Sequence, residues 1–488
     1  MSPAARARAL PAALIFIVAV TAIISSLGAP LIPSISEDLG VSLSAAQWSL
    51  TATLLIGVVS SPVMGRLGDG PRRRETIVGG LVVVTVGSVI SALAGSLPLL
   101  VAGRAMQGVG LGLLPLAMAT AREELPAERS VSVIAILSVT GATGIGAGYP
   151  LSGLLAEIDL SAAFWFGALV AALGLAVAVF LIPSTKGKPQ ASVDLPGAVL
   201  LTAGLTSLLI AIAEGSSWGW GSSATVILFG AAIVLLAVWA VQQLRAREPL
   251  VDLRLARDRR VLTGYVCVTV LGMALYLYLS AVSEYVQTPK STGYGFGVSV
   301  VVAGLCLVPF SVMSLVGSRA LSFSERLVGR RSVLPVGSLL VAAAGLIFAL
   351  LDDHLWGSFA MMAVFGLGAG ITFGAIAGLI VRSVPQDQTG SAMGFYQVVR
   401  YIGFSIGSAL TASVLASETP AGGQFPHQSG FIALAWIGIG ISVVSAILGW
   451  VLPGRGDGPD AAPDAAERRR EEEEAELASA GLPGVGPS

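Results

Sequence analysis

Long apolar segments are the feature that most restricts the fold of this chain. Each is about 20 residues long, enough to cross the hydrocarbon core of a bilayer as a helix. We count fourteen, at approximately 11–31, 45–64, 76–95, 98–120, 130–156, 161–183, 195–213, 222–243, 261–285, 297–318, 332–351, 356–380, 391–415 and 429–451. The composition agrees, because 54% of the 488 residues are hydrophobic and only 12% are charged, unlike a soluble domain. The sequence predicts an all-α integral membrane protein with fourteen transmembrane helices.

Basic residues are sorted between alternate connections, as the positive-inside rule requires. With the amino terminus inside, 25 of the 28 lysines and arginines lie in inner connections or termini. Arg104 and Arg400 lie within segments, and Lys290 alone lies outside. We therefore expect a multi-pass protein of the plasma membrane with both termini cytoplasmic. No small-residue cleavage site follows the first segment, so we expect it to be retained as a helix.

The chain contains an internal repeat. Gly108-Val109-Gly110-Leu111-Gly112 recurs as Gly366-Leu367-Gly368-Ala369-Gly370. Pro126 follows the first copy as Pro385 follows the second, and the pair Gly144 and Gly148 recurs at a matched offset as Gly403 and Gly407. Segments 1–6 and 9–14 therefore read as two copies of one six-helix unit in the same orientation, with segments seven and eight inserted between them.

The repeat predicts the organisation of the chain. We expect an N-terminal six-helix bundle at 1–183, two inserted helices with inner loops at 184–260, a C-terminal six-helix bundle at 261–452 and a disordered cytoplasmic tail at 453–488. The tail has too little apolar surface to fold. Two parallel bundles with a site between them at mid-depth are a transporter architecture.

Three short motifs lie in the first copy. The inner connection after the second segment carries Gly65, Asp69, Arg72, Arg73 and Arg74; the fourth segment carries Arg104, Gln107 and Gly108; the fifth carries Gly144, Gly148, Pro150 and Gly153. An arginine near the middle of a membrane helix costs about 2.5–3.5 kcal/mol on insertion scales, so it normally faces the bundle interior or water. Small residues four positions apart let helix backbones approach closely in lipid.

These motifs resemble those of the major facilitator superfamily, specifically its fourteen-helix drug:proton antiporters. The resemblance implies an inner gate at the first motif, a coupling motif in the fourth segment and an antiporter motif in the fifth. This chain departs from the family pattern at Gly70 and Arg72 in the first motif. Tyr149 also separates the glycine and proline of the antiporter motif, which weakens the inference of antiport.

An expected carboxylate is missing. Members of this family usually carry an aspartate in the first helix, about nine residues before the proline that corresponds to Pro33, and here Ile24 stands at that position. Two acids near the outer ends of segments remain as proton carriers, Glu214 and Glu284, although each also fits a solvated outer carboxylate. We favour Glu284, because its sequence neighbours are aromatic or amide residues: Tyr276, Tyr278, Tyr285 and Gln287.

Arg400 is the second arginine within a segment. It either closes a contact between helices or binds an anionic or polar substrate together with its neighbours Tyr396, Gln397 and Tyr401. Arg104 is open to the same two interpretations. There a functional arginine would lower the pKa of a neighbouring carboxylate and couple its proton to the substrate.

The sequence does not support a metal site, a nucleotide site or a catalytic site. Cys267 and Cys306 lie within segments, the two histidines are too isolated for a metal site, and no lysine follows a glycine-rich loop in the manner of a nucleotide cradle. We predict no catalytic residues, cofactor, nucleotide or nucleic-acid partner. The prediction is a monomeric, proton-coupled exporter of small, mostly apolar molecules. A symporter or facilitated-diffusion carrier is one alternative. A membrane sensor or scaffold is another, against which the two membrane-embedded arginines argue.

Overall fold

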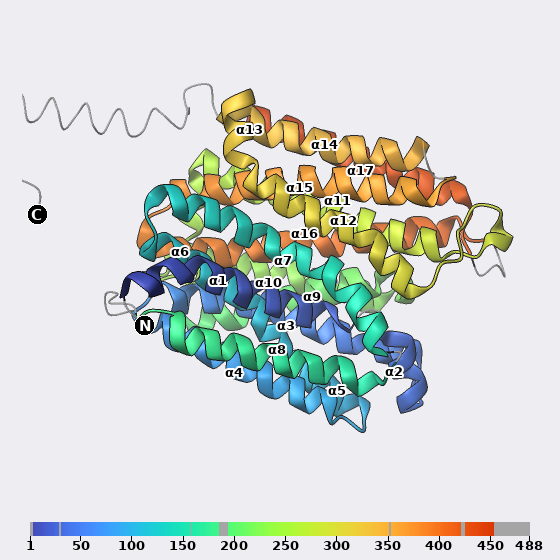
Figure 1. Ribbon diagram of the computed structural model, residues 1–488, viewed down its shortest axis with the longest axis horizontal. Helices are drawn as coiled ribbons and strands as arrows, with labels where there is room; N and C mark the ends of the chain where they lie inside the picture. The colour runs from blue at the N-terminus through green and yellow to red at the C-terminus, as the bar shows by residue number, and fades with distance from the viewer. Residues whose placement is uncertain are drawn as a thin grey trace, which may run out of the picture.

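The computed structural model describes residues 3–28, 31–156, 158–184, 194–350, 353–420 and 425–452, and these residues form helices joined by short turns (Figure 1). Thirteen helical segments of the described part are long and apolar enough to cross a membrane. Helix α7 (Ala127–Ala156), with 30 residues, occupies the remaining predicted position. The prediction of an all-α membrane protein is confirmed. The tail at 453–488 lies outside the described residues.

The first six predicted segments form one group of helices. They are α1 (Pro3–Ser26), α3 (Leu43–Gly68), α4 (Arg73–Ala92), α5 (Leu97–Gly108) continued by η1 (Val109–Gly112) and α6 (Leu113–Glu124), then α7 and α8 (Leu160–Leu181). The fourth segment changes to 3₁₀ geometry at η1, within the repeated glycine sequence. The short α2 (Ile32–Leu39) was not predicted. The connection between the predicted segments 98–120 and 130–156 is shorter than expected, because α6 runs to Glu124 and α7 begins at Ala127.

The remaining helices follow in chain order. They are α9 (Leu195–Trp218), α10 (Ser223–Arg245), η2 (Leu253–Arg257), α11 (Arg259–Gln287), η3 (Lys290–Thr292), α12 (Val300–Arg319), α13 (Leu321–Val328), α14 (Arg330–Leu350), α15 (Leu355–Ser383), η4 (Gln386–Gln388), α16 (Thr389–Ser417) and α17 (Gln428–Val451). The short amphipathic α13 was not predicted. We call the end of the molecule that carries the α3–α4 and α15–α16 turns the inner end, following the charge asymmetry of the sequence.

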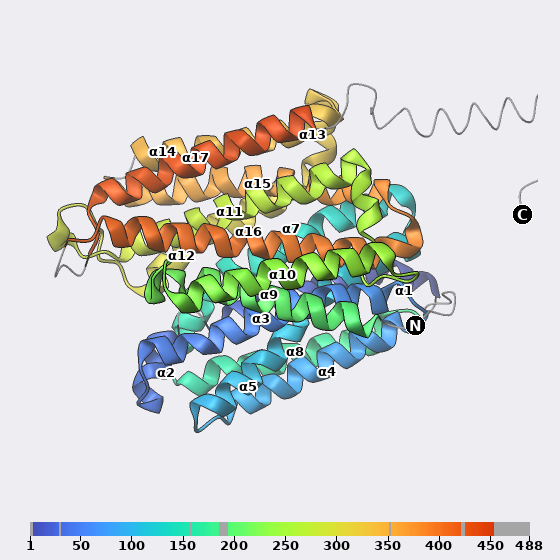
Figure 2. The same ribbon diagram turned by 180° about the vertical axis from the view of Figure 1, so that it is seen from behind.

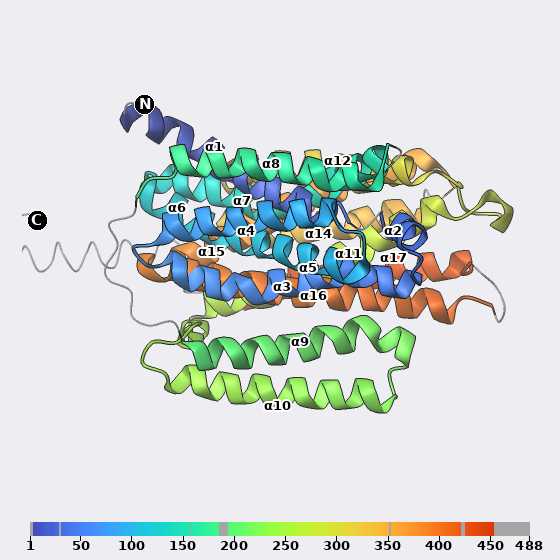
Figure 3. The same cartoon turned by 90° about the horizontal axis from the view of Figure 1, so that it is seen from below.

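The inserted helices lie as a separate pair on one flank (Figure 3). Helix α9 contacts both α3 and α16, and α10 packs on α9. Seen from behind, the pair lies across the boundary between α3 and α16 (Figure 2). Helix α10 exposes large apolar side chains such as Ile227, Ile233 and Val234. Because such a surface is compatible with lipid rather than water, we place this pair at the periphery of the bundles.

Equivalent glycines make equivalent helix contacts in the two copies of the repeat. A Cβ on Gly144 would overlap Ala22 of α1, and one on Gly403 would overlap the Thr269 carbonyl of α11. In the same way, Gly108 backs onto α3 and Gly366 onto α12. In each copy the fifth helix is therefore held against the first, and the fourth helix against the second, by the same glycine positions. Such backbone proximity is expected where helices associate in lipid.

Candidate functional site

Asp69 joins the two bundles at the inner end. It caps the end of α3, and its Oδ1 accepts a hydrogen bond of 2.6 Å from the N–H of Gly390. Its Oδ2 accepts hydrogen bonds from the N–H of Ser391, at 2.9 Å, and from the Ser391 hydroxyl. Gly390 and Ser391 lie in the first turn of α16, whose N–H groups lack helical partners and carry the positive end of the helix dipole. The carboxylate thus binds a helix N-terminus of the other bundle.

The pKa of Asp69 is set mainly by its burial. Removal from water raises the pKa to about 6, although the hydrogen bonds from Ser391 and Gly390 and the charge of Arg73 act in the opposite direction. Desolvation penalises the ionised form of a carboxyl group, whereas donors and cations favour it. This carboxyl group can therefore change its protonation near neutral pH.

Gly65, the first glycine of the same motif, brings the backbones together. A Cβ on Gly65 would overlap the carbonyl of Gly390, and a Cβ on Gly390 would overlap the carbonyl of Gly65. One turn further along α16, Gly394 backs onto Ser61 and Pro62 of α3. Any larger side chain here would separate α3 from α16 and stretch the hydrogen bonds of Asp69.

The arginines of this motif do not cross between the bundles. Arg73 donates to the Gly68 carbonyl and forms an ion pair with Glu123 of α6. Arg74 donates to the Val179 carbonyl of α8 over 2.7 Å. Arg72 is exposed at the start of α4. The predicted inner-gate residues thus divide into Gly65 and Asp69, which contact the other bundle, and three arginines at the N-terminal bundle.

A cation that the motif analysis missed does cross. Arg122, near the end of α6, donates from Nη2 to the Val384 carbonyl over 2.9 Å and from Nη1 to the Thr389 hydroxyl over 2.6 Å. The repeat contained a signal for it, because Arg122 stands four residues before Pro126 and Arg382 three before Pro385. Together with Asp69, Arg122 closes the inner end of the molecule.

Arg104 caps the end of the first helix. Its Nη1 donates to the Ile24 carbonyl and its Nη2 to the Ser25 carbonyl, both over 3.1 Å, and Nη1 also donates to Gln107 Oε1. Helix α1 ends at Ser26, so these are carbonyls of its last turn, which lack helical donors and carry the negative end of the dipole. A Cβ on Gly28 would overlap the Arg104 guanidinium. The buried arginine therefore has a defined structural partner.

Ile24 itself lies in an apolar environment. Its side chain is fully buried in a small cluster with Val20, Val84 and Ala171. The position at which the family resemblance led us to expect an aspartate is thus lined by hydrocarbon. None of the ion pairs found in the described part of the chain includes Arg104.

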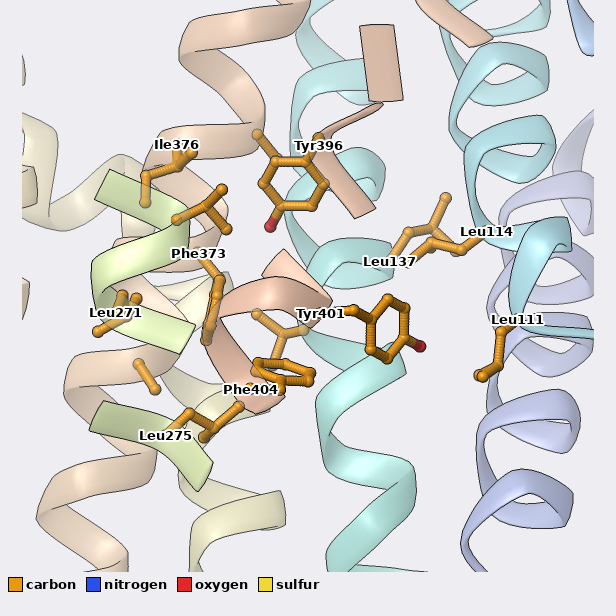
Figure 4. Close-up of a cluster of buried hydrophobic side chains, with 14 of the residues drawn as sticks. Leu111, Leu114, Leu137, Leu271, Leu275, Phe373, Ile376, Tyr396, Tyr401 and Phe404 are labelled. Atoms are coloured by element: carbon orange, nitrogen blue, oxygen red, sulfur yellow. The ribbon is translucent and has the colours of Figure 1, made fainter. Parts of the chain in front are cut away.

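Arg400 lies between the bundles in α16, surrounded by aromatic rings. Its Nη1 donates over 3.0 Å to the Ser138 carbonyl of α7, and the Ser138 hydroxyl is 2.7 Å from that of Tyr396. The rings of Phe373, Tyr396, Tyr401 and Phe404 lie with their centroids 5.8, 5.5, 5.7 and 5.5 Å from the guanidinium carbon. Figure 4 shows Phe373, Tyr396 and Phe404 near one another, with the Tyr401 ring directed toward Leu111.

The environment expected around Glu284 is not formed. Glu284 is exposed near the outer end of α11, while Tyr278 and Tyr285 are buried against Phe365 and Phe431 respectively. Along a helix, residues at these spacings point to different faces, so closeness in sequence did not bring them together. Gln287 donates within its own helix to Ser283.

Tyr276 belongs instead to the Arg400 region, since its ring stacks on Phe404 with centroids 4.8 Å apart. Gln397, buried one turn before Arg400, has no partner for Oε1 among the described residues. Glu214 is half-buried at the outer end of α9 and accepts a hydrogen bond of 2.7 Å from Ser217. The structure therefore brings Tyr276, Tyr396 and Tyr401 to the Arg400 region, whereas Tyr278 and Tyr285 pack elsewhere and neither outer acid joins them.

The predicted motif of the fifth segment lies on two interfaces. Gly144 and Gly148 face α1, whereas Pro150 lies against Gly304 of α12, in the other bundle. Gly153 falls in the last turns of α7, and the side chain of Tyr149 is outside the described part. Helix α7 thus contacts its own bundle and the opposite one with adjacent residues.

Comparisons with known proteins agree with this architecture. The chain is 29% identical over 402 residues to a probable actinorhodin transporter of Streptomyces coelicolor, covering 78% of this chain and 68% of that protein. It is 28% identical over 401 residues to a tetracenomycin C resistance and export protein of Streptomyces glaucescens, covering 81% and 73%. It is 30% identical over 436 residues to a cephamycin export protein of Amycolatopsis lactamdurans, covering 86% and 87%.

Solved structures share the fold at low sequence identity. The human organic anion transporter MFSD10 superposes with a TM-score of 0.63 at 17% identity, covering 92% of this chain and 100% of that chain. The proton:xylose symporter XylE superposes with a TM-score of 0.60 at 16% identity, covering 93% and 97%. The family profile described as Major Facilitator Superfamily matches residues 14–408. The chain therefore belongs to the Major Facilitator Superfamily of membrane transporters.

Proposed function

We propose that this protein is a proton-coupled exporter of small, mostly apolar molecules that works by alternating access in the bacterial plasma membrane. The observation that carries the proposal is the contact of Asp69 with the first turn of α16. Alternating access requires a contact between the bundles that closes one end and can be released. The export named for the relatives from Streptomyces and Amycolatopsis supports the outward direction of transport and a small-molecule cargo.

Closure of the inner end corresponds to the state in which cargo leaves outward. From the N-terminal bundle, Asp69 binds the start of α16 and Arg122 binds the α15–α16 turn. Both contacts must break before the inner end can admit cargo. Because Asp69 and Arg122 both bind backbone atoms of the other bundle, the two contacts are lost together when the helices move apart. Release and reformation of this pair of contacts is the proposed gating step.

Proton coupling needs a group that changes protonation during the cycle. Arginine stays protonated in proteins, which leaves the carboxylates. Among these, the Asp69 carboxyl group contacts the other bundle, and burial raises its pKa to about 6. Glu284 stays a second candidate at the outer end, and its exposed position gives it less desolvation. We place the coupling proton on Asp69 first.

Reconstituted vesicles provide the test. Purified protein is inserted into liposomes that hold a fluorescent, uncharged apolar dye, and flux of the dye is followed with and without an imposed pH gradient. We expect cargo movement to accelerate at least about tenfold when protons flow in the opposite direction. Equal flux with and without the gradient would show that transport is not coupled to protons.

A second candidate function is uncoupled facilitated diffusion. The specific observation in its favour is Ile24, because the usual place of the first-helix carboxylate is filled by hydrocarbon. Under this alternative the same vesicles would move cargo down its own gradient at a rate independent of the pH gradient. The single flux experiment thus separates the two functions.

A further inference from the structure

Arg400 is a buried cation whose charge is not neutralised by a neighbouring acid. Its side chain is fully buried at mid-depth in α16, and none of the ion pairs found in the described part includes it. Its Nε has no hydrogen-bond partner among those residues. A guanidinium has five N–H donors, and an unneutralised charge at this depth in a membrane is costly. The residue therefore calls for an explanation beyond packing.

Comparison with Arg104 sharpens this point. Arg104 is equally buried, and its Nε also lacks a hydrogen-bond partner among the described residues. It differs because it caps two carbonyls at the end of α1 and is fixed by Gln107. Arg400 terminates no helix; its Nη1 reaches across the boundary between bundles to the Ser138 carbonyl. It therefore lies where the architecture of these transporters places substrate, at mid-depth between the two repeats.

The surroundings of Arg400 suit one kind of ligand. Four aromatic rings enclose the guanidinium, and Tyr276 extends them by stacking on Phe404. Figure 4 shows Tyr401 reaching from α16 toward the opposite bundle, where Leu111, Leu114 and Leu137 form an apolar wall. Flat aromatic molecules stack favourably on such rings. The region thus offers apolar and aromatic surface on both sides and one positive charge between them.

We propose that Arg400 is the anion-binding residue of the transport site, and that the cargo includes aromatic acids whose carboxylate pairs with this guanidinium. Arginine matches a carboxylate with two parallel hydrogen bonds. Gln397, with its buried and unpartnered Oε1, would accept a hydrogen bond from a donor group on the same ligand. This inference rests on the proposed transport function and specifies its substrate class.

The test compares two probes that differ only in charge. Binding of 2-naphthoate and of the neutral 2-naphthamide to the purified full-length protein is measured by titration calorimetry at pH 7.5. We expect the wild-type protein to bind the acid at least about tenfold more tightly, as a charge-assisted pair would provide. Equal affinities, or no binding of either probe, would overturn the proposal.

Substitutions test whether Arg400 causes the preference for 2-naphthoate over 2-naphthamide. We expect Arg400→Gln to bind the two probes equally, Arg400→Lys to retain part of the preference, and Phe404→Leu to weaken both probes to the same extent. The exposed Arg245→Gln serves as a control that keeps the full preference. A preference that survives in Arg400→Gln would overturn the proposal. If that variant does not fold, the wild-type comparison and Arg400→Lys still decide.

Transport measurements separate this inference from the proposed function. The two probes and a neutral dye are loaded into vesicles that contain the wild-type protein. Export of the dye without preference between the probes would refute the anion site and leave the exporter intact. Preferential binding of 2-naphthoate without export of any compound would refute the exporter and leave the anion site in place.

Discussion

The Oδ1 atom of Asp69 accepts a hydrogen bond of 2.6 Å from the backbone N–H of Gly390, and so joins the end of α3 to the first turn of α16 across 321 positions of sequence. The contact is possible because neither Gly65 nor Gly390 carries a side chain at the crossing. A single carboxylate and two glycines thereby close one end of a structure built from two bundles.

Loss of this carboxylate is expected to open the inner end. An asparagine amide presents one acceptor oxygen instead of two, so Asp69→Asn cannot bind both the Gly390 and the Ser391 N–H. In a background with Cys267→Ala and Cys306→Ala, we expect Val384→Cys to be labelled by a maleimide from the inner side at least about fivefold faster when Asp69→Asn is added. Arg72→Gln, which removes an exposed charge of the same motif, is the control. Equal labelling with and without Asp69→Asn would mean that this contact does not hold the gate.

The same labelling assay is expected to depend on pH. Closure raises the pKa of Asp69 from its ordinary 3.8 to about 6, so the closed state binds this proton more tightly than an open, hydrated state. The resulting stabilisation of the closed state is complete below about pH 4 and is lost as pH rises through 6. Labelling at Val384→Cys, normalised to an exposed Arg257→Cys, should increase with a midpoint near pH 6. A pH profile that Asp69→Asn leaves unchanged would exclude Asp69 as the titrating group.

Substitution of Arg104 is expected to impair transport while the protein still inserts. Arg104→Ala removes the donors to the Ile24 and Ser25 carbonyls, and Arg104→Lys cannot reproduce the planar fork that serves both. We expect at least about a tenfold loss of flux for both variants, with normal amounts in the membrane. Wild-type flux in the lysine variant would show that only the charge is needed. Normal flux in both would make Arg104 purely structural.

The outer acids are expected to be dispensable. Glu284 is exposed and is not enclosed by the tyrosines near it in sequence, and Glu214 is bound only locally by Ser217. We expect Glu284→Gln and Glu214→Gln each to keep more than about half of the flux driven by a pH gradient. Abolition of that flux in Glu284→Gln, with downhill exchange preserved, would restore Glu284 as the proton carrier.

Replacing a glycine at a close helix contact by alanine is expected to lower the stability of the protein. Gly407→Ala would place a Cβ on the Met273 carbonyl, a backbone atom that cannot rotate away. Such overpacking costs about 1–3 kcal/mol, so we expect a lower midpoint in a thermal unfolding scan in detergent. Gly440→Ala in α17 is the matched control, because no atom lies within 4 Å of the added Cβ. There the midpoint should stay constant or rise, since alanine favours the helix.

Much of the fold could be predicted from the sequence, because a membrane imposes strong local rules. A segment that crosses hydrocarbon must satisfy its own backbone hydrogen bonds, so length and hydropathy alone identify helices such as α11 and α15. The repeated glycine spacing indicated the two bundles, because the same close approach recurs wherever Gly144 or Gly403 faces its first helix. The short helices α2 and α13 were not predicted, since each has only 8 residues and lacks a membrane-length apolar segment.

The contacts of the candidate site were decided by the tertiary structure. Sequence spacing placed Tyr278 near Glu284. In the helix the two side chains point to different faces, and Tyr278 packs on Phe365 in the core. The sequence placed Asp69 in an expected inner-gate motif but did not reveal its partners or the role of Arg122, because the groups that both residues bind lie more than 250 residues away. The sequence alone determined that Arg400 is a cation within the membrane. Only the packing of α7 and α15 against α16 decided that it reaches Ser138 and Phe373, since these two residues come from other helices. The other three rings belong to α16 itself.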